Sequence, residues 1–247
     1  MATLTPFGGD GAVDYGAVGD YLDLLGSAGV GTVLVNGTTG EFASMTVRER
    51  RQMLEFCRDR WDGVLIAHVG AAAARDVIDL IEHGNEFADA LAVIAPYYFA
   101  DPSEAGVERF YTETLRYSRK PVLLYSFPRH TQVRISPDLV ERLAARFSVL
   151  CGVKDSGKDF AVSREYKTRC PRLEVFLGDD RVGARVDELG VDGVVTGAGG
   201  PVAELPLAIA AARRRGDDDA MHGWQKVFDL YTDRRKSAPV SDIAFIL

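Results

Sequence analysis

The chain has 247 residues, of which 29 are Lys or Arg and 36 are Asp or Glu, giving a formal net charge of −7 at pH 7. An acidic chain without a long basic or apolar run is poorly suited to nucleic acid or a membrane, because those partners need clustered cations or long apolar segments. Since the chain lacks a secretory signal and its three cysteines form no CxxC or Cys/His motif, we expect a cytoplasmic protein with small-molecule partners and neither a disulfide nor a metal site.

Short apolar runs alternate with longer amphipathic stretches along nearly the whole chain. We expect a shortened first strand and seven further strands, at residues 2–5, 32–35, 64–67, 91–94, 121–124, 148–150, 173–177 and 193–195. The seven later runs lack alternate polar positions, which is typical of parallel strands that are buried on both faces.

Helix start and stop signals lie between these runs. Thr46 and Glu49 have the spacing of a capping box, and Ser136 precedes a proline that suits the first position of a helix. Basic residues before Gly216 and acidic residues after it favour the end of one helix and the start of the next.

The repeated strand–helix unit predicts the fold class. About eight such units favour an α/β fold of the (β/α)8 TIM-barrel class over residues 1–200. Residues 201–247 are expected to form a short C-terminal helical extension. A doubly wound open sheet fits the same alternation, although no strand is followed by a G-x-G-x-x-G turn, and it stays open as an alternative.

Reactive side chains gather where the predicted strands end, which is where TIM barrels carry their chemistry. The segments concerned are Asn36–Glu41, His68–Gly70, Pro96–Tyr98, Tyr125–Thr131, Lys154–Ser156, Gly178–Asp180 and Thr196–Gly200. Hydroxyls, phenols and one amine would therefore converge on a single rim and form a pocket.

Lys154 is the strongest catalytic candidate on this rim. It follows an apolar run, so its amine is expected at the mouth of an apolar barrel, where desolvation lowers a lysine pKa and favours attack on a carbonyl. From the spacing alone, a loop-stabilising ion pair of Lys154 with Asp155 or another carboxylate of the rim is an equally good interpretation.

Hydroxyl groups expected near Lys154 add to this hypothesis. The phenol of Tyr125 could relay protons, and Thr38 and Thr39 could extend the relay or bind a carboxylate. A buried structural tyrosine and a turn-capping threonine pair are the alternatives.

Four segments together resemble a known family: Gly37–Glu41, Pro96–Tyr98, Tyr125–Pro128 and Gly152–Asp155. They are similar to the signature segments of the dihydrodipicolinate synthase/N-acetylneuraminate lyase family, which are class I, Schiff-base aldolases. The resemblance runs in order from Leu4 to about Gly200 and implies a (β/α)8 barrel. It also implies that no metal or organic cofactor is needed, because the lysine itself forms the iminium.

The resemblance implies roles for individual residues. Lys154 would form the imine with pyruvate or another 2-oxo acid, and Tyr125 would relay protons. Thr38 and Thr39 would bind the carboxylate and join the relay, and Val195 matches a position whose backbone carbonyl lies near the bound oxo acid.

Assembly is also implied by the resemblance. Tyr98 is similar to a tyrosine that family members contribute across a subunit interface, so we expect a homo-oligomer, either a dimer or a tetramer. Family members usually carry a longer C-terminal helical appendage, so the extension over residues 201–247 is expected to be shortened.

The aldehyde acceptor is left open by two departures from the family pattern. The first is that the usual Y-N-x-P segment is here Tyr125-Ser126-Phe127-Pro128; the second concerns an arginine. In dihydrodipicolinate synthases, an arginine two residues after the proline that corresponds to Pro128 binds the carboxylate of aspartate semialdehyde. Here His130 takes that position and Arg129 precedes it, and an imidazole cannot replace a bidentate guanidinium. Gly178 begins a segment similar to one that contacts the second substrate in the synthases. Both a synthase-like and a 2-keto-3-deoxy sugar acid aldolase-like reaction are therefore possible.

Two further functions stay open as alternatives. The glycine-rich segment 197–200 could offer backbone N–H groups to an anion, as in phosphate-binding TIM-barrel enzymes. Alternatively, the protein could be a non-catalytic family member that binds a 2-oxo acid without turning it over.

Overall fold

The computed structural model describes residues 1–99 and 101–237. A curled, fully parallel sheet lies at the centre of this part of the chain, with its seven strands in sequence order. The strands are β1 (Thr32–Val35), β2 (Val64–His68), β3 (Ala90–Ile94), β4 (Val122–Ser126), β5 (Leu150–Asp155), β6 (Glu174–Leu177) and β7 (Gly193–Val194).

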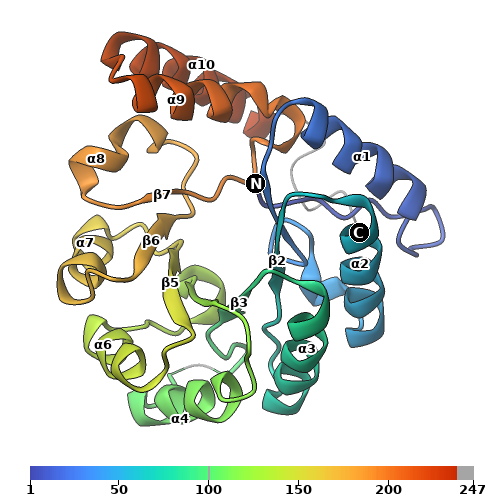
Figure 1. Ribbon diagram of the computed structural model, residues 1–247, viewed down its shortest axis with the longest axis vertical. Helices are drawn as coiled ribbons and strands as arrows, with labels where there is room; N and C mark the ends of the chain where they lie inside the picture. The colour runs from blue at the N-terminus through green and yellow to red at the C-terminus, as the bar shows by residue number, and fades with distance from the viewer. Residues whose placement is uncertain (100, 238–247) are drawn as a thin grey trace.

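Helices surround the sheet as a ring, because each parallel neighbour is reached by a crossover that packs on the outer face (Figure 1). Their bounds are α1 (Tyr15–Ser27), α2 (Val47–Arg60), α3 (Ala74–Phe87), α4 (Glu104–Leu115), α5 (Pro128–Thr131), α6 (Pro137–Arg146), α7 (Phe160–Arg169), α8 (Val186–Leu189), α9 (Glu204–Arg215) and α10 (Asp218–Ser237). Short 3-10 turns lie at Phe42–Ser44, Gly183–Arg185 and Gly200–Val202. No helix in the two described ranges is long and apolar enough to span a membrane.

The predicted helix signals occupy the positions expected of them. Thr46 caps α2 in a complete capping box with Glu49. Ser136 caps α6 ahead of a proline in the first turn, and Gly216 ends α9 in the left-handed conformation.

The shortened first strand expected at residues 2–5 is reduced to a single bridge. The N–H of Ala2 donates to the carbonyl of Thr196 beyond β7 at 2.8 Å, and the N–H of Thr3 donates to the carbonyl of Leu34 in β1 at 3.0 Å. The Thr5 hydroxyl turns instead to the carbonyl of Gly40 at 2.7 Å, so the ladder does not continue. The N-terminal residues thus bridge the two outer strands, and Figure 1 shows the N-terminus beside the end of β7.

Two strands were placed too early by the sequence pattern. The expected strand at 148–150 is β5, which runs to Asp155 and contains Lys154, and β4 likewise extends to Tyr125 and Ser126. The apolar runs end before these polar residues, but the backbone pairing continues through them.

Apolar side chains form four clusters among the described residues, one of which, Phe42, Ile94 and Tyr125, lies at the strand ends. The largest core lies between the sheet and the helices, and a small cluster of Leu34, Ala92 and Leu123 fills the concave side of the sheet. A third cluster joins α9 and α10 to two residues near the strand ends, Ala184 and Ala198. The last two helices are thereby anchored beside the loops that follow β6 and β7.

Candidate active site

Tyr125 and Lys154 lie side by side because they are direct partners in the β4–β5 register. Side chains of paired residues in neighbouring strands project to the same side of a sheet. The Lys154 Nζ lies 3.9 Å from the centroid of the Tyr125 ring, and only 5% of Lys154 and 2% of Tyr125 are exposed. The site thus has a buried amine against a phenol ring.

A bulge in β5 sets this alignment. Val122 pairs with Leu150 but Leu123 pairs with Gly152, so Cys151 is the extra residue and the remainder of β5 is shifted by one position. At Gly152 the backbone approaches β6 so closely that an added Cβ would lie 2.2 Å from the carbonyl oxygen of Glu174. Only glycine fits there.

The threonine pair after β1 meets the phenol and the glycine-rich loop. Thr38 Oγ1 lies 3.1 Å from the Tyr125 hydroxyl. Thr39 packs against Gly197, where an added Cβ would lie 2.4 Å from the Thr39 hydroxyl. The two adjacent threonine side chains therefore contact different parts of the site, Thr38 the phenol of Tyr125 and Thr39 the glycine-rich loop.

Asp155 does not pair with Lys154. Successive side chains of a strand point to opposite faces, and the Asp155 carboxylate accepts hydrogen bonds from the Ser163 hydroxyl at 2.6 Å and from the N–H of Gly157 at 2.8 Å. The ion pairs found among the described residues do not include Lys154. The loop-stabilising interpretation of Lys154 is therefore not supported by the geometry.

His68 also contacts the Tyr125 ring. Its ring lies 5.8 Å from the Tyr125 ring in an edge contact, and its Nδ1 lies 2.8 Å from the backbone carbonyl of Asn36, so Nδ1 carries the proton. Burial, together with Arg50 and Lys154, holds the His68 pKa well below its ordinary value. The ring is thus neutral at pH 7. No cluster of three or more His, Cys, Asp or Glu suited to a metal occurs within residues 1–99 and 101–237.

A cavity of about 420 Å³ joins these groups, within the size range of small-molecule sites. Among the predicted site residues, those that line it are Thr38, Thr39, Tyr125, His130, Lys154, Gly178 and Val195. It lies at the carboxyl ends of the parallel strands, where the sequence placed a pocket.

Tyr98 and Arg129 do not line this cavity. Tyr98 is 85% exposed and has a left-handed backbone, with φ 83°, and the neighbouring Phe99 is 75% exposed. Arg129 and His130 are both exposed, but only His130 lines the cavity, where its ring packs edge-on against Phe127. Partial burial and the charge of Arg129 lower the pKa of His130, so its imidazole is neutral at pH 7.

Three polar residues of the cavity were not among the predicted site residues: Ser156, Asp180 and Arg235. The first two belong to segments that the sequence placed on the rim, so strand-end position was a usable signal. Arg235 lies on α10, far from the motifs in sequence, and no local pattern marks it.

Glu41, which follows the threonine pair, provides a test of pH dependence. It is only 6% exposed, its Oε1 has no hydrogen-bond partner among the residues described, and burial raises its pKa from 4.5 to about 7. Because the folded-state pKa is raised, this group's stabilising contribution is present below about pH 4.5 and is lost as the pH rises through about 7. We expect Glu41→Gln to lose less stability than the parent over that interval, measured by urea unfolding.

An exposed glutamate on α3, Glu86, offers the matched control. Glu86→Gln should leave the slope of unfolding free energy against pH as it is in the parent. If Glu41→Gln shows the parental slope as well, the Glu41 carboxyl does not titrate in this range.

Comparison with known proteins agrees with the geometry. A family model described as the dihydrodipicolinate synthetase family matches residues 1–243. An uncharacterized DapA-like lyase of Chloroflexus aurantiacus is 34% identical over 89% of this chain and 75% of its own length. The 4-hydroxy-tetrahydrodipicolinate synthase 1 of Streptomyces coelicolor is 33% identical over 87% of this chain and 71% of its own.

Solved structures of the same kind superimpose closely. YagE of E. coli K12, in complex with pyruvate, has a TM-score of 0.89 at 29% identity, covering 98% of this chain and 82% of its own. A 2-keto-3-deoxygluconate aldolase of Sulfolobus has a TM-score of 0.84 at 27% identity, covering 93% of this chain and 78% of its own. The family match over nearly the whole chain, together with these relatives, shows that the chain belongs to the dihydrodipicolinate synthetase family.

Proposed function

We propose that this protein is a class I aldolase that forms a Schiff base between Lys154 and pyruvate or a related 2-oxo acid. It then makes or cleaves a carbon–carbon bond to an aldehyde. Members of the family are lyases, and the observation that carries the finer proposal is the buried Lys154 amine, 3.9 Å from the ring centroid of Tyr125. The Tyr125 hydroxyl in turn lies 3.1 Å from Thr38 Oγ1, which gives protons a path to and from the reacting carbonyl.

In this mechanism the Lys154 amine attacks the 2-oxo carbon and gives a carbinolamine, which loses water to become an iminium. Tyr125 supplies the proton to the departing hydroxyl, and Thr38 exchanges protons with Tyr125. The iminium withdraws electrons, so loss of a proton from the adjacent carbon gives an enamine. The enamine attacks the aldehyde carbon, the new alkoxide takes up a proton, and water releases the product from Lys154.

The carboxylate of the oxo acid needs donors beside Lys154. We assign this role to the Thr38–Thr39 segment, whose hydroxyls lie in the cavity wall. Val195 lines the same cavity, with its backbone near the expected position of the oxo acid. Gly178 lines the acceptor side, where a side chain would collide with Ser156.

The (β/α)8 barrel and its assembly belong to the same proposal. The bridge that Ala2 makes between Leu34 and Thr196 supports an eighth, vestigial strand. Tyr98 and Phe99 form an exposed aromatic pair, which supports a subunit contact at which Tyr98 reaches a partner copy. The division at residue 200, the cytoplasmic location and the choice between dimer and tetramer stay predictions.

The phosphate-binding alternative finds less support. The glycines of segment 197–200 allow close packing, since an added Cβ would meet Thr39 at Gly197 and the Tyr21 hydroxyl at Gly200. The N–H of Gly199 already donates to Thr196 Oγ1 at 2.9 Å. These contacts explain the glycines without an anion.

Reductive trapping tests the proposal directly. The protein incubated with pyruvate and borohydride should gain a stable covalent adduct on Lys154, located by peptide mass spectrometry. Absence of the adduct under native conditions, or its appearance only on other lysines, would overturn the aldolase assignment. Trapping without turnover of any aldehyde would instead favour a non-catalytic oxo-acid-binding protein.

A further inference from the structure

Arg50, near the start of α2, is a buried cation for which the proposed mechanism has no use. Only 3% of it is exposed, and it does not line the cavity that contains Lys154. Burial lowers its pKa to about 10, so the guanidinium stays charged at pH 7. In the ion pairs of residues 1–99 and 101–237, three other arginines of α2 have a carboxylate partner, and Arg50 takes no part. A charge buried in this way needs other partners to offset its desolvation.

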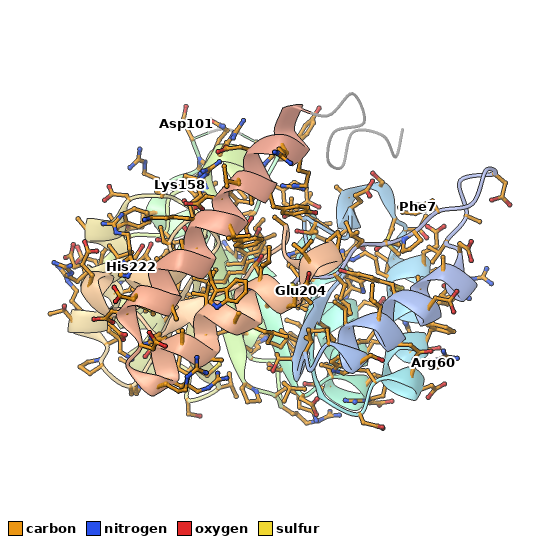
Figure 2. All side chains as sticks on the ribbon, turned by 90° about the horizontal axis from the view of Figure 1, so that it is seen from above. Phe7, Arg60, Asp101, Lys158, Glu204 and His222 are labelled. Carbon is orange, nitrogen blue, oxygen red and sulfur yellow. The ribbon has the colours of Figure 1, made fainter. Side chains whose placement is uncertain are left out.

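The direction of α2 places Arg50 near the catalytic edge of the molecule. Figure 2 shows Arg60, the last residue of α2, toward the edge opposite to Asp101 and Lys158, which lie in loops that follow β3 and β5. Helix α2 therefore begins at the edge where the strands end, and Arg50 lies close to that beginning. A side chain from the ring of helices can thus reach the strand ends.

The partners of Arg50 are backbone carbonyls at the end of β2. Its Nη1 donates to the carbonyl of Gly70 and its Nη2 to the carbonyl of His68, each at 2.8 Å. The guanidinium also lies 5.2 Å from the centroid of the Phe42 ring, which packs against the His68 ring at 4.4 Å. Because one planar group holds two carbonyls at once, the backbone at the end of β2 is fixed in direction as well as in position.

Asn36 links this arginine to the segment that carries the threonine pair. Its Nδ2 donates to the backbone carbonyl of Arg50 at 2.8 Å, and its own carbonyl accepts from the Nδ1–H of His68 at 2.8 Å. Burial and, next to it, the charge of Arg50 hold the His68 pKa well below its ordinary value, so this N–H remains a donor from a neutral ring. Asn36 has a left-handed backbone, with φ 56°, where the chain turns toward Thr38. These contacts close a ring that joins α2, the end of β2 and the segment after β1.

Two members of this arrangement contact Tyr125. The His68 ring packs edge-on against the phenol ring, with the centroids 5.8 Å apart, and Thr38 Oγ1 lies 3.1 Å from the phenol hydroxyl. A shift of either contact would change the direction of the hydroxyl or the length of the hydrogen bond through which its proton passes. The geometry of the relay therefore depends on the ring that Arg50 closes.

We propose that Arg50 is a positioning residue for the proton relay between Tyr125 and Thr38, an inference that rests on the proposed aldolase function. The guanidinium fixes the end of β2 and, with it, the His68 ring. Through Asn36 it also fixes the start of the threonine segment. Arg50 thus acts on the reaction from outside the cavity, through the groups that it holds.

Exchange of the methyl protons of pyruvate with D2O tests this without an aldehyde, because it requires only the iminium and the enamine. Arg50→Met removes both bonds to the carbonyls and leaves an apolar side chain in the buried site. We expect kcat for the exchange, followed by proton NMR, to fall by about 10- to 100-fold, because a misplacement of about 1 Å can cost as much. KM for pyruvate should change by less than about threefold, since Thr39 keeps its contact with Gly197.

A double-mutant cycle separates positioning from a general loss of stability. Asn36→Gly removes the amide that holds Arg50, and glycine suits the left-handed backbone at this position. It should lower kcat more than it changes KM. If both residues act along one path, the double variant loses about as much kcat as the more affected single variant, whereas independent structural effects multiply.

Arg51→Gln is the matched control, since Arg51 is the adjacent arginine of α2, its side chain is 42% exposed and its Nη1 lies 3.1 Å from Asp79 Oδ1. It should exchange pyruvate protons as the parent does. If Arg50→Met fails to fold, Arg50→Lys and Asn36→Gly decide the question. Lysine keeps the charge but cannot hold two carbonyls as a planar fork, so kcat should stay about fivefold or more below that of the parent.

The two levels of the proposal fail differently. Parental kcat in Arg50→Met or in Arg50→Lys, or losses that multiply in the double variant, overturn the positioning role alone. Absence of both proton exchange and borohydride trapping on Lys154 in the parent overturns the aldolase function itself.

Discussion

Lys154→Met is expected to abolish carbon–carbon lyase activity, with kcat lower by on the order of 10⁴-fold or more, because no other group can form the imine. The fold should survive, because methionine has nearly the shape of the lysine stem and because the group it removes belongs to a side chain that is only 5% exposed. Replacing a buried charge by an apolar side chain of similar volume is often neutral or stabilising. Aldol turnover and borohydride trapping, measured together with the thermal midpoint, check both parts.

Lys158→Met is the matched control for this variant. Lys158 lies four residues further on, its side chain is 63% exposed, and its Nζ is 3.5 Å from Asp179 Oδ2. It should retain parental turnover and trapping. Turnover by Lys154→Met within about tenfold of the parent would contradict the imine mechanism, since tenfold corresponds to only about 1.4 kcal/mol of barrier.

Gly152→Ala is expected to destabilise the protein by about 3 kcal/mol or more, because the new methyl group has no space. It would lie 2.2 Å from the Glu174 carbonyl and 2.9 Å from Leu123 Cδ2. The carbonyl belongs to the β5–β6 pairing and cannot withdraw without breaking the sheet two residues before Lys154. Urea unfolding should show the lower stability, and any folded fraction should trap pyruvate poorly.

Gly223→Ala provides the opposite expectation in the same chain. Gly223 lies inside α10, and an added Cβ there has nothing within 4 Å. Alanine in a helix interior is favoured over glycine by about 1 kcal/mol, so this variant should be more stable than the parent. Equal stability of Gly152→Ala and the parent would mean that β5 and β6 can separate without cost.

The strand positions could be predicted because buried parallel strands are apolar throughout, but their ends could not. The sequence pattern predicts Lys154 and Asp155 beyond the strand, because polar residues at the end of an apolar run are typical of a loop. In the folded sheet Lys154 faces the cavity and Asp155 is satisfied by Ser163. Polar residues can therefore stay inside the hydrogen-bonded strand.

Much of the candidate site was also accessible from the sequence, since strand-end segments share one edge by topology. The sequence could not decide between Arg129 and His130. These adjacent residues of the short helix α5 point in different directions, and only His130 reaches the cavity. The place of Arg235 in the cavity wall could not be predicted either, because it depends on how α10 packs across the molecule through contacts such as Gln225 with Asp180. No local pattern encodes such long-range packing.

The bridge from Ala2 to Thr196 has a consequence for the order of folding. A contact between the second residue and residue 196 closes a very long loop, and such contacts form late because their entropic cost is met only after local structure exists. During synthesis the N-terminal residues emerge first, yet their partner is made near the end. Ala2 and Leu4 line the same cavity as Val195 and Gly197, so a nascent chain can build its helices and most of its strands and still have no finished site. The cavity is therefore completed in one late step, when the N-terminal residues pair with the residues that follow β7.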